Sequence, residues 1–248
     1  MAQITEIAPD VYRICVLCKE INLQFCHFLV KDEEPLLFHT GFRRMFSEVR
    51  DGVEQIMDPA KLRWISWSHF ESDECGALND WLTIAPHAEP ACNMVGALVN
   101  INDFATRQPK LLDPTHVLTT GNYHFRYIST PQLPHGWDAG VLFEETDKTL
   151  FCSDLYHQAG DVEPITSVSV LDRVKTTLGE LQQGPLAGYV PYTNRTGQIL
   201  HQLADLKPRT LAVMHGSSFS GDCEGELHGL AKVMKEVLGN EAAEMAAD

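Results

Sequence analysis

The stretch HFESDECGALNDW, residues 69–81, directly follows the apolar run LRWISWS of residues 62–68. It places His69, Glu71 and Asp73 at every second position, with Glu74 immediately after them. The apolar run predicts a buried strand, and alternate residues of an extended chain point the same way. The spacing therefore predicts that these side chains converge just beyond a strand end. The alternative is a solvated polar loop with an acidic cap for a helix over residues 75–82.

Three further residues that can bind metals stand at strand ends or in a loop between strands. His135 lies in the proline-rich loop TPQLPHGWDAG, Asp154 ends the apolar run TLFCSD, and His215 lies near the end of TLAVMHG. A single such histidine is usually a hydrogen-bonded core residue. Three candidates of this kind, together with a His-x-Glu-x-Asp sequence, favour a metal site.

Length and composition limit the class of protein. The chain has 248 residues, 44% of them hydrophobic and 21% charged, which is typical of a folded domain with a substantial core. We expect one domain over residues 1–248. No apolar run approaches the roughly 20 residues of a membrane helix, and no secretory signal is visible, so we expect a cytoplasmic protein without a membrane partner. The net charge of −15 argues against nucleic acid as a partner.

The seven cysteines are scattered, an odd number that indicates free thiols in a reducing compartment. Cys15 and Cys18 form a CxxC sequence within the strand-like run VYRICVLC, with no second pair to complete a zinc site. We interpret both as packing thiols, with metal or redox use as the alternative.

The order of elements predicts the architecture. Short apolar runs indicate strands in both halves of the chain, and apolar residues at helical spacing follow them. Strands followed by helices, twice over, favour two sheets packed face to face with helices outside, an α/β fold arranged as a four-layer αββα sandwich. The predicted helices cover residues 43–57, 169–183, 195–207 and 225–239, and we expect a frayed tail over residues 240–248.

The pattern His-x-Glu-x-Asp, then a histidine, an aspartate and a histidine at positions 135, 154 and 215, resembles the metal site of the metallo-β-lactamase superfamily. More narrowly, it resembles the di-iron domain of flavodiiron proteins. The resemblance implies the αββα fold and a possible homodimer. It also implies that His69, Glu71 and His135 bind one metal, that Asp73 and His215 bind the other, and that Asp154 bridges them.

Two glutamates set the sequence apart from the zinc hydrolases of that superfamily, which have His-x-His-x-Asp-His. Glu71 and Glu74 each replace a neutral nitrogen ligand by an anionic oxygen. Such a site suits iron or manganese better than zinc, although zinc also accepts carboxylates. Flavodiiron proteins usually have histidine at the position of Glu74. That residue could bind the second metal, hydrogen-bond a metal-bound water, or turn outward.

Three competing functions follow from the resemblance and the ligands. We favour a di-iron oxidoreductase that binds or reduces O2, or NO; the alternatives are a two-metal zinc hydrolase and a non-enzymatic oxygen sensor. Flavodiiron proteins carry a C-terminal domain with FMN, and about 33 residues follow His215 here. We therefore expect two iron ions, no FMN in this chain, and a separate electron donor that is a flavin or rubredoxin-type protein.

Several neighbouring residues have weaker predictions. His39 either supports the ligands or is simply packed. Tyr156 and His157, directly after Asp154, could line the pocket or serve the structure, and Trp137, beside His135, could form a wall of the pocket.

Overall fold

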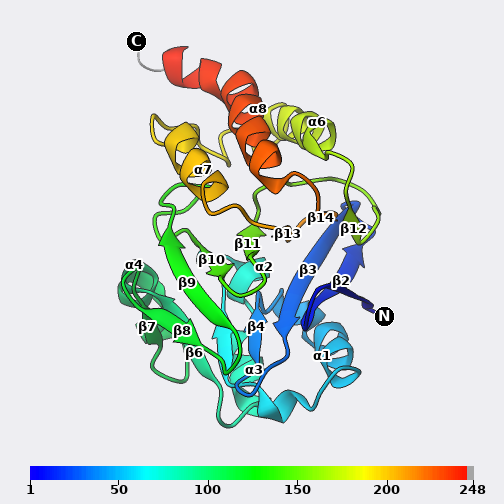
Figure 1. The fold of residues 1–248 in the computed structure, drawn as a ribbon, viewed down its shortest axis with the longest axis vertical. Coiled ribbons are helices and arrows are strands. Elements are labelled where there is room, and N and C mark those ends of the chain that lie inside the picture. Colours follow the sequence, from blue (N-terminus) through cyan, green and yellow to red (C-terminus); the bar gives the residue numbers. More distant parts are fainter. Residues whose placement is uncertain (245–248) are drawn as a thin grey trace.

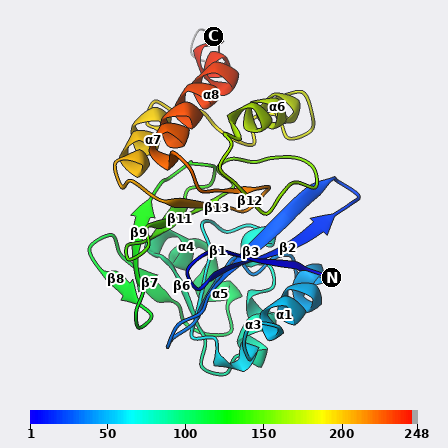
Figure 2. The ribbon, with the colours of Figure 1, turned by 45° about the vertical axis from the view of Figure 1, so that its right-hand side comes forward.

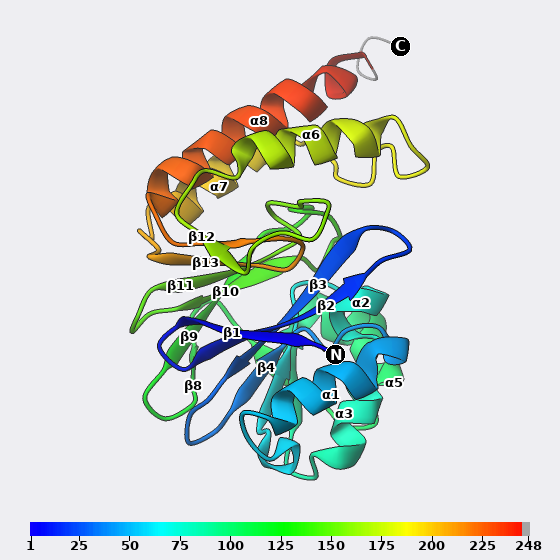
Figure 3. The same ribbon diagram turned by 90° about the vertical axis from the view of Figure 1, so that its right-hand side faces the viewer.

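Two seven-stranded sheets pack face to face, and helices cover their outer faces (Figures 1 and 3). The computed structural model describes the backbone of residues 1–244 and the side chains of residues 1–239. Viewed from the side, helices α6, α7 and α8 lie on one outer face, and α1 and α3 lie on the other (Figure 3). The prediction of a four-layer αββα sandwich is confirmed.

The first sheet has the order β1-β2-β3-β4-β5-β6-β7. Strands β1 to β4 pair antiparallel, whereas β4 to β7 pair parallel, so the carboxyl ends of β4 and β5 lie at the same edge. The strands are β1 (Gln3–Ala8), β2 (Val11–Cys18), β3 (Leu23–Val30), β4 (Leu36–Phe38), β5 (Trp64–Ser66), β6 (Glu89–Asn93) and β7 (Lys110–Leu112).

The second sheet has the order β12-β14-β13-β11-β10-β9-β8. Its central pair, β11 and β13, is parallel, and the antiparallel meander β8 to β11 forms one side. The strands are β8 (Val117–Thr119), β9 (His124–Ser129), β10 (Gly140–Glu144), β11 (Thr149–Ser153), β12 (Ile165–Thr166), β13 (Thr210–Val213) and β14 (Ser218–Phe219). Figure 2 shows β2 and β3 of the first sheet extending beside the β12–β13 side of the second.

The four predicted helices agree with the structure in place and differ in length, whereas the helical segment of residues 94–104 was not predicted. Residues 43–57 form a 3₁₀ turn followed by α1 (Phe46–Glu54), and the last helix, α8, is longer than expected. The expectation of fraying from residue 240 is wrong up to residue 244, and residues 245–248 lie outside the described part. The remaining helices are α2 (Ser72–Cys75), α3 (Leu78–Ile84), α4 (Met94–Gly96), a π-helical stretch (Ala97–Ile101), α5 (Asn102–Phe104), α6 (Leu171–Gln182), α7 (Thr196–Ala204) and α8 (Cys223–Glu244).

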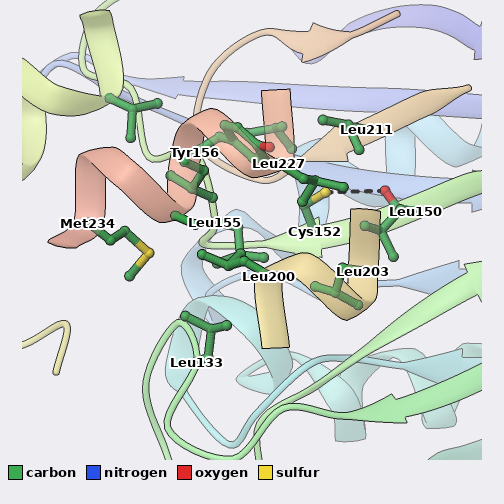
Figure 4. Close-up of a cluster of buried hydrophobic side chains, with 14 of the residues drawn as sticks. Leu133, Leu150, Cys152, Leu155, Tyr156, Leu200, Leu203, Leu211, Leu227 and Met234 are labelled. Carbon is green, nitrogen blue, oxygen red and sulfur yellow. Dashed lines mark hydrogen bonds between the residues drawn. The ribbon is translucent and has the colours of Figure 1, made fainter. Parts of the chain in front are cut away.

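Apolar side chains fill three layers of core. Between the sheets, Phe28, Phe38 and Phe125 surround Phe151, with ring centroids 5.3–6.1 Å from its own. A second cluster packs α1 and α3 on the first sheet, and a third packs α6, α7 and α8 on the second (Figure 4). Both faces of each central strand are therefore buried, which explains why these strands read as continuous apolar runs. Among the described residues, no helix has the length and apolarity that crossing a membrane requires.

Among the residues that the structure describes, one buried histidine has no hydrogen-bond partner on either ring nitrogen. His27 lies in β3, and its ring edge fills the space beside Gly41, where an added Cβ would lie 2.7 Å from the His27 Cε1. Gly41 has a φ of +80°, so both space and backbone conformation require glycine at that turn. Burial lowers the pKa of His27 from 6.5 to about 3. The folded protein therefore holds this imidazole neutral.

We expect His27→Leu to flatten the acid dependence of stability. Below pH 6.5 the unfolded chain binds a proton at His27, whereas the folded chain binds it only near pH 3. Acid therefore destabilises the native state. The free energy of unfolding of the wild type should fall by up to about 1.4 kcal/mol per pH unit more steeply than that of the variant. Denaturant titrations of the metal-free proteins between pH 6.5 and 4 measure this difference. His87→Leu, at an exposed histidine, is the control, and parallel curves for wild type and His27→Leu would contradict the assignment.

Candidate metal centre

The candidate ligands gather where strands of both sheets end. Asp154 directly follows β11, and His215 is two residues beyond β13. Because β11 and β13 are parallel, their carboxyl ends meet at one edge of the second sheet. His69 is three residues beyond β5, whose carboxyl end lies in the first sheet. The site is therefore built between the two sheets and needs both of them.

The residues after His69 form a loop and a helical turn rather than an extended strand. Glu71 has extended backbone angles and precedes α2, and Asp73 lies inside that short helix. The expectation that alternation would bring three side chains to one spot is therefore wrong in detail. The helical turn separates Asp73 from His69 and Glu71, so that they supply two neighbouring groups.

His135 reaches the site from the loop between β9 and β10. The loop is closed by hydrogen bonds from the Gln132 N–H to the Gly136 carbonyl, 2.7 Å, and from the Thr130 hydroxyl to the Leu133 carbonyl, 2.7 Å. The His135 ring then lies edge-on to His69, with centroids 4.1 Å apart. The proline-rich loop thus carries His135 to the first group.

Six of the seven candidate residues form two groups that share Asp154. In the first, the Nε2 atoms of His69 and His135 lie 3.1 Å and 3.3 Å from Glu71 Oε2, and 3.5 Å and 2.9 Å from Asp154 Oδ2. In the second, His215 Nε2 lies 3.0 Å from Asp154 Oδ1 and 3.4 Å from Asp73 Oδ2. Asp154 thus presents one oxygen to each group. These are the two sets that the resemblance implies; metal binding by them stays a prediction.

The second ring nitrogens of two histidines have hydrogen-bond partners behind the site. His215 Nδ1 lies 2.9 Å from the carbonyl oxygen of Gln24, and His69 Nδ1 lies 3.2 Å from the Ser68 hydroxyl. When the imidazole is neutral, a proton on Nδ1 leaves the lone pair of Nε2 free to face the groups described above. Such partners fix the tautomer and ring orientation of metal-ligating histidines.

The buried carboxylates favour positive charge between the sheets. Burial would lower the pKa of His69, but the charge of Glu74 and the hydrogen bond to Glu71 raise it to about 10. Asp154 and Asp73 likewise hold the pKa of His215 well above its ordinary value, against the effect of burial. Burial opposes ionisation of Asp154, but hydrogen bonds from His135 and His215 hold its pKa well below the usual range. The centre is therefore built to attract cations.

A buried oxygen without a donor fits this chemistry. Asp73 Oδ1 is inaccessible to solvent and accepts no hydrogen bond from the described residues, and Asp154 Oδ1 has His215 Nε2 beside it at 3.0 Å. A buried carboxylate oxygen without a partner is costly unless a cation balances it. Three imidazoles and three carboxylates aimed into two adjoining groups fit two metal ions, and every ligand atom of a group lies within 4.8 Å of the others.

Glu74 lies in neither group. Its carboxylate is fully buried and accepts hydrogen bonds from the Ser68 N–H, 2.8 Å, and from the Ser153 hydroxyl, and it lies 3.2 Å from His39 Nε2. The outward orientation considered for Glu74 is therefore excluded. Burial, first of all, raises its pKa to about 8. Glu74 connects the segments that precede His69 and Asp154. This placement favours a residue that positions the ligands over one that binds a metal.

Two aromatic residues contact the ligands directly. The Tyr189 hydroxyl donates a hydrogen bond of 2.7 Å to Glu71 Oε2, and its ring lies against His135, with centroids 4.1 Å apart. The ring of His157 stacks on His215 at 4.5 Å, and burial lowers the pKa of His157 to about 3. Sequence reasoning considered His157 but missed Tyr189, since PLAGYVPY carries no signal that could place it near residue 71.

Three other residues that the sequence placed near the site have different surroundings. His39 is buried and lies between Glu74 and the carbonyl of Cys26, which faces its Nδ1 at 3.3 Å, so it stands behind the ligands. Tyr156 lies in the helix-covered core of the second sheet (Figure 4), where it borders a small cavity together with Asp154 and His157. Trp137 is 69% exposed and borders a separate hollow with Met94 and Leu111, so the expectation that it forms a wall of this site is wrong.

Residues 23–216 match the family described as ODP family beta lactamase. The chain belongs to this family. It is 26% identical over 171 residues to the putative diflavin flavoprotein A 1 of Thermosynechococcus vestitus, which covers 62% of this chain and 29% of that protein. The chain thus spans about a third or less of the length of the curated relatives it matches.

Solved structures share the fold. A flavoprotein from Thermotoga maritima superposes with a TM-score of 0.80 at 20% identity, over 95% of this chain and 62% of that one. The rubredoxin oxygen:oxidoreductase of Desulfovibrio gigas gives 0.79 at 18% identity, over 93% and 61%. A fragment of the putative diflavin flavoprotein A 5 of Nostoc gives 0.79 at 15% identity, over 98% of both chains. This chain therefore has the metallo-β-lactamase-type fold of flavodiiron cores, as the resemblance implied.

We predict that Asp154→Ala lowers the content of both metals, because its two oxygens face the two groups. Metal analysis after equilibrium dialysis should show fewer than one tightly held ion per chain, against about two for the wild type. Asp172→Ala, an exposed aspartate on α6, is the control. Loss of a single ion would show that Asp154 serves one metal only.

Proposed function

We propose that this protein is a non-haem di-iron protein that binds or reduces O2, with NO as a second possible ligand. The observation that carries the proposal is the pair of adjoining ligand groups that share Asp154. Two-metal sites place their ions about 3.5–4 Å apart, close enough for both to act on one small molecule. The names of the relatives, which include a rubredoxin oxygen:oxidoreductase, support oxygen as that molecule.

The donor set supports iron. Each group contains carboxylate oxygens with imidazole nitrogens, and Glu71 stands where a zinc hydrolase of the superfamily would have a neutral histidine. Hard oxygen ligands with imidazole suit iron or manganese, and extra negative charge stabilises the higher oxidation state. Two iron ions, when bound, would supply the electrons that reduce the gas molecule.

The protein's own residues orient this centre and limit its contact with water. Gln24 and Ser68 fix the rings of His215 and His69, and the Tyr189 hydroxyl donates a hydrogen bond to Glu71. Glu71 is the most exposed ligand, with 34% of its side chain accessible, whereas Asp154 is nearly inaccessible at 3%. Ligand and electrons therefore reach the centre most directly on the Glu71 side.

A hollow of about 360 Å3 borders Glu71 on that side. Its lining includes Phe42, Phe70 and Phe104, with Arg43 and Arg44.

We propose that the electrons come from a flavin or rubredoxin-type donor, as the names of the diflavin flavoprotein and rubredoxin oxygen:oxidoreductase relatives suggest.

The reaction is tested on protein expressed and purified without oxygen. We expect about two irons per chain, and sustained O2 consumption that depends on an added rubredoxin-type or flavin donor, with slow consumption from NAD(P)H alone. The same chain loaded with zinc is the control, because zinc has no redox chemistry. A native preparation with two tightly held zinc ions that iron cannot replace would overturn the proposal. Stoichiometric O2 binding without turnover would restrict it to oxygen binding.

Glu71→His tests the reason given for iron. The exchange removes one negative charge from the first group and adds a neutral nitrogen, so zinc should compete better. We expect a higher zinc-to-iron ratio and slower O2 consumption than in the wild type, measured after loading both proteins in the same equimolar metals without oxygen. Glu163→His, at a glutamate that pairs with Arg173 and belongs to neither group, is the matched control. Identical metal selection by wild type and Glu71→His would show that Glu71 does not set metal identity.

A further inference from the structure

Two cysteines lie directly opposite one another on neighbouring strands behind the metal centre. Cys15 of β2 and Cys26 of β3 are register partners, and both side chains are buried in the core between the sheets. The backbone N–H of Cys26 donates to the Met214 carbonyl, 2.9 Å, and its carbonyl faces His39. The two cysteines are therefore a non-hydrogen-bonded pair, for which the Cα atoms are typically about 4.5 Å apart. A disulfide spans Cα separations of about 4.4–6.8 Å.

A buried arginine without an acidic partner crosses this pair. Along one face of the ladder the register partners are Arg13 with Phe28, Cys15 with Cys26, and Leu17 with Gln24. Arg13 Nη2 donates to Gln24 Oε1, 3.0 Å, so the arginine side chain runs past the cysteines to the far side of them. The Arg13 side chain is fully buried, and its Nε and Nη1 have no hydrogen-bond partner among the described residues.

A buried guanidinium without an acidic partner calls for an anion, since a buried charge is stable only when it is balanced. No carboxylate forms an ion pair with Arg13 in the described part of the chain. A cysteine thiolate is the anion that this position can supply. The same positive charge argues against a metal ion bound by the two sulfurs.

We propose that Cys15 and Cys26 are a redox-active pair that hydrogen peroxide oxidises to a disulfide. The Cys26 thiolate attacks one peroxide oxygen, the O–O bond breaks, and hydroxide leaves while Cys26 becomes a sulfenic acid. The Cys15 thiol then attacks the Cys26 sulfur, the S–S bond forms, and water leaves. The two sulfurs lose two electrons in total, and the peroxide gains them.

Within this proposal the nucleophile is Cys26. Its Sγ lies 3.8 Å from the carbonyl oxygen of Gly216, the same carbonyl that Arg13 contacts. Burial raises the pKa of both thiols, whereas Arg13 lowers the pKa of both, so the guanidinium favours one thiolate in the pair. Cys18, the other half of the CxxC sequence, instead donates its thiol proton to Glu20 outside this core.

The pair is connected to the metal centre through backbone. Arg13 Nη2 also donates to the carbonyl of Gly216, 3.0 Å, and the carbonyl of Gln24 faces His215 Nδ1. Oxidation of the thiols would remove the anion beside Arg13. Arg13 contacts Gln24 and Gly216, which lie in the two segments that position His215. The thiol chemistry itself needs no metal, so it can be tested whether or not the di-iron proposal holds.

The test uses the full chain, with its metals and after chelation, reduced with dithiothreitol and then treated with hydrogen peroxide. Trypsin separates Cys15 on residues 14–19 from Cys26 on residues 20–31. We expect these peptides to be joined by a disulfide, two of the seven thiols to be lost in a denaturing titration, and dithiothreitol to restore them. Separate peptides with all seven thiols intact would overturn the proposal.

Matched variants decide which cysteines react. Cys18→Ser should still form the link, whereas Cys15→Ser should not, and its Cys26 should stop as a sulfenic acid that dimedone traps. Arg13→Met should slow the reaction about tenfold, because less Cys26 is ionised. A link that disappears in Cys18→Ser and persists in Cys15→Ser would assign the chemistry to Cys18 and contradict the pairing. If Arg13→Met does not fold, the comparison of the wild type with Cys15→Ser and Cys18→Ser still tests the pairing.

Discussion

The carboxylate of Asp154 is the constraint around which the site is built. It is almost fully buried, follows β11 directly, and turns one oxygen to His69 and His135 and the other to His215. An anion in that position is stable only while cationic or hydrogen-bonding partners surround it. The parallel pairing of β11 with β13 holds His215 on one side of Asp154. The loop between β9 and β10 places His135 on the other side.

The two sheets contribute different parts of this arrangement. The second sheet supplies Asp154, His215 and the loop of His135, whereas the first supplies His69, Glu71 and Asp73 beyond β5. The phenylalanine layer around Phe151 joins the sheets directly below, so the relative position of the ligands follows from the packing of the core. Close-packed interiors tolerate little displacement, and this rigidity suits a site whose ligand atoms must converge.

Polar groups behind the ligands extend the site into the sandwich. Glu74 connects Ser68 and Ser153, the residues directly before His69 and Asp154, and His39 lies against its carboxylate. On the other side, Gln24 contacts both His215 and Arg13, which runs past Cys15 and Cys26. The metal groups and the proposed thiol pair thus use neighbouring strands and share one set of backbone contacts.

The sequence by itself determined the apolar strands of both halves, four of the helices and the identity of the candidate ligands, but not β6, β7 or the helical segment of residues 94–104. Apolar runs and helical spacings are local properties, and the spacing of His69, Glu71, Asp73, His135, Asp154 and His215 is visible in one dimension. The alternation argument nevertheless misjudged Asp73, because a helical turn begins at Ser72 and replaces the extended chain.

Only the tertiary structure decided how these residues are used. Glu74 lies behind the ligands because Ser68 and Ser153, 85 residues apart in the sequence, meet across the two sheets and donate to it. Tyr189 reaches Glu71 from a segment with no local signal, and Cys15 faces Cys26 instead of Cys18 because successive strand side chains alternate between faces. Such contacts join residues distant in sequence, and their geometry depends on sheet register and packing that no local pattern encodes.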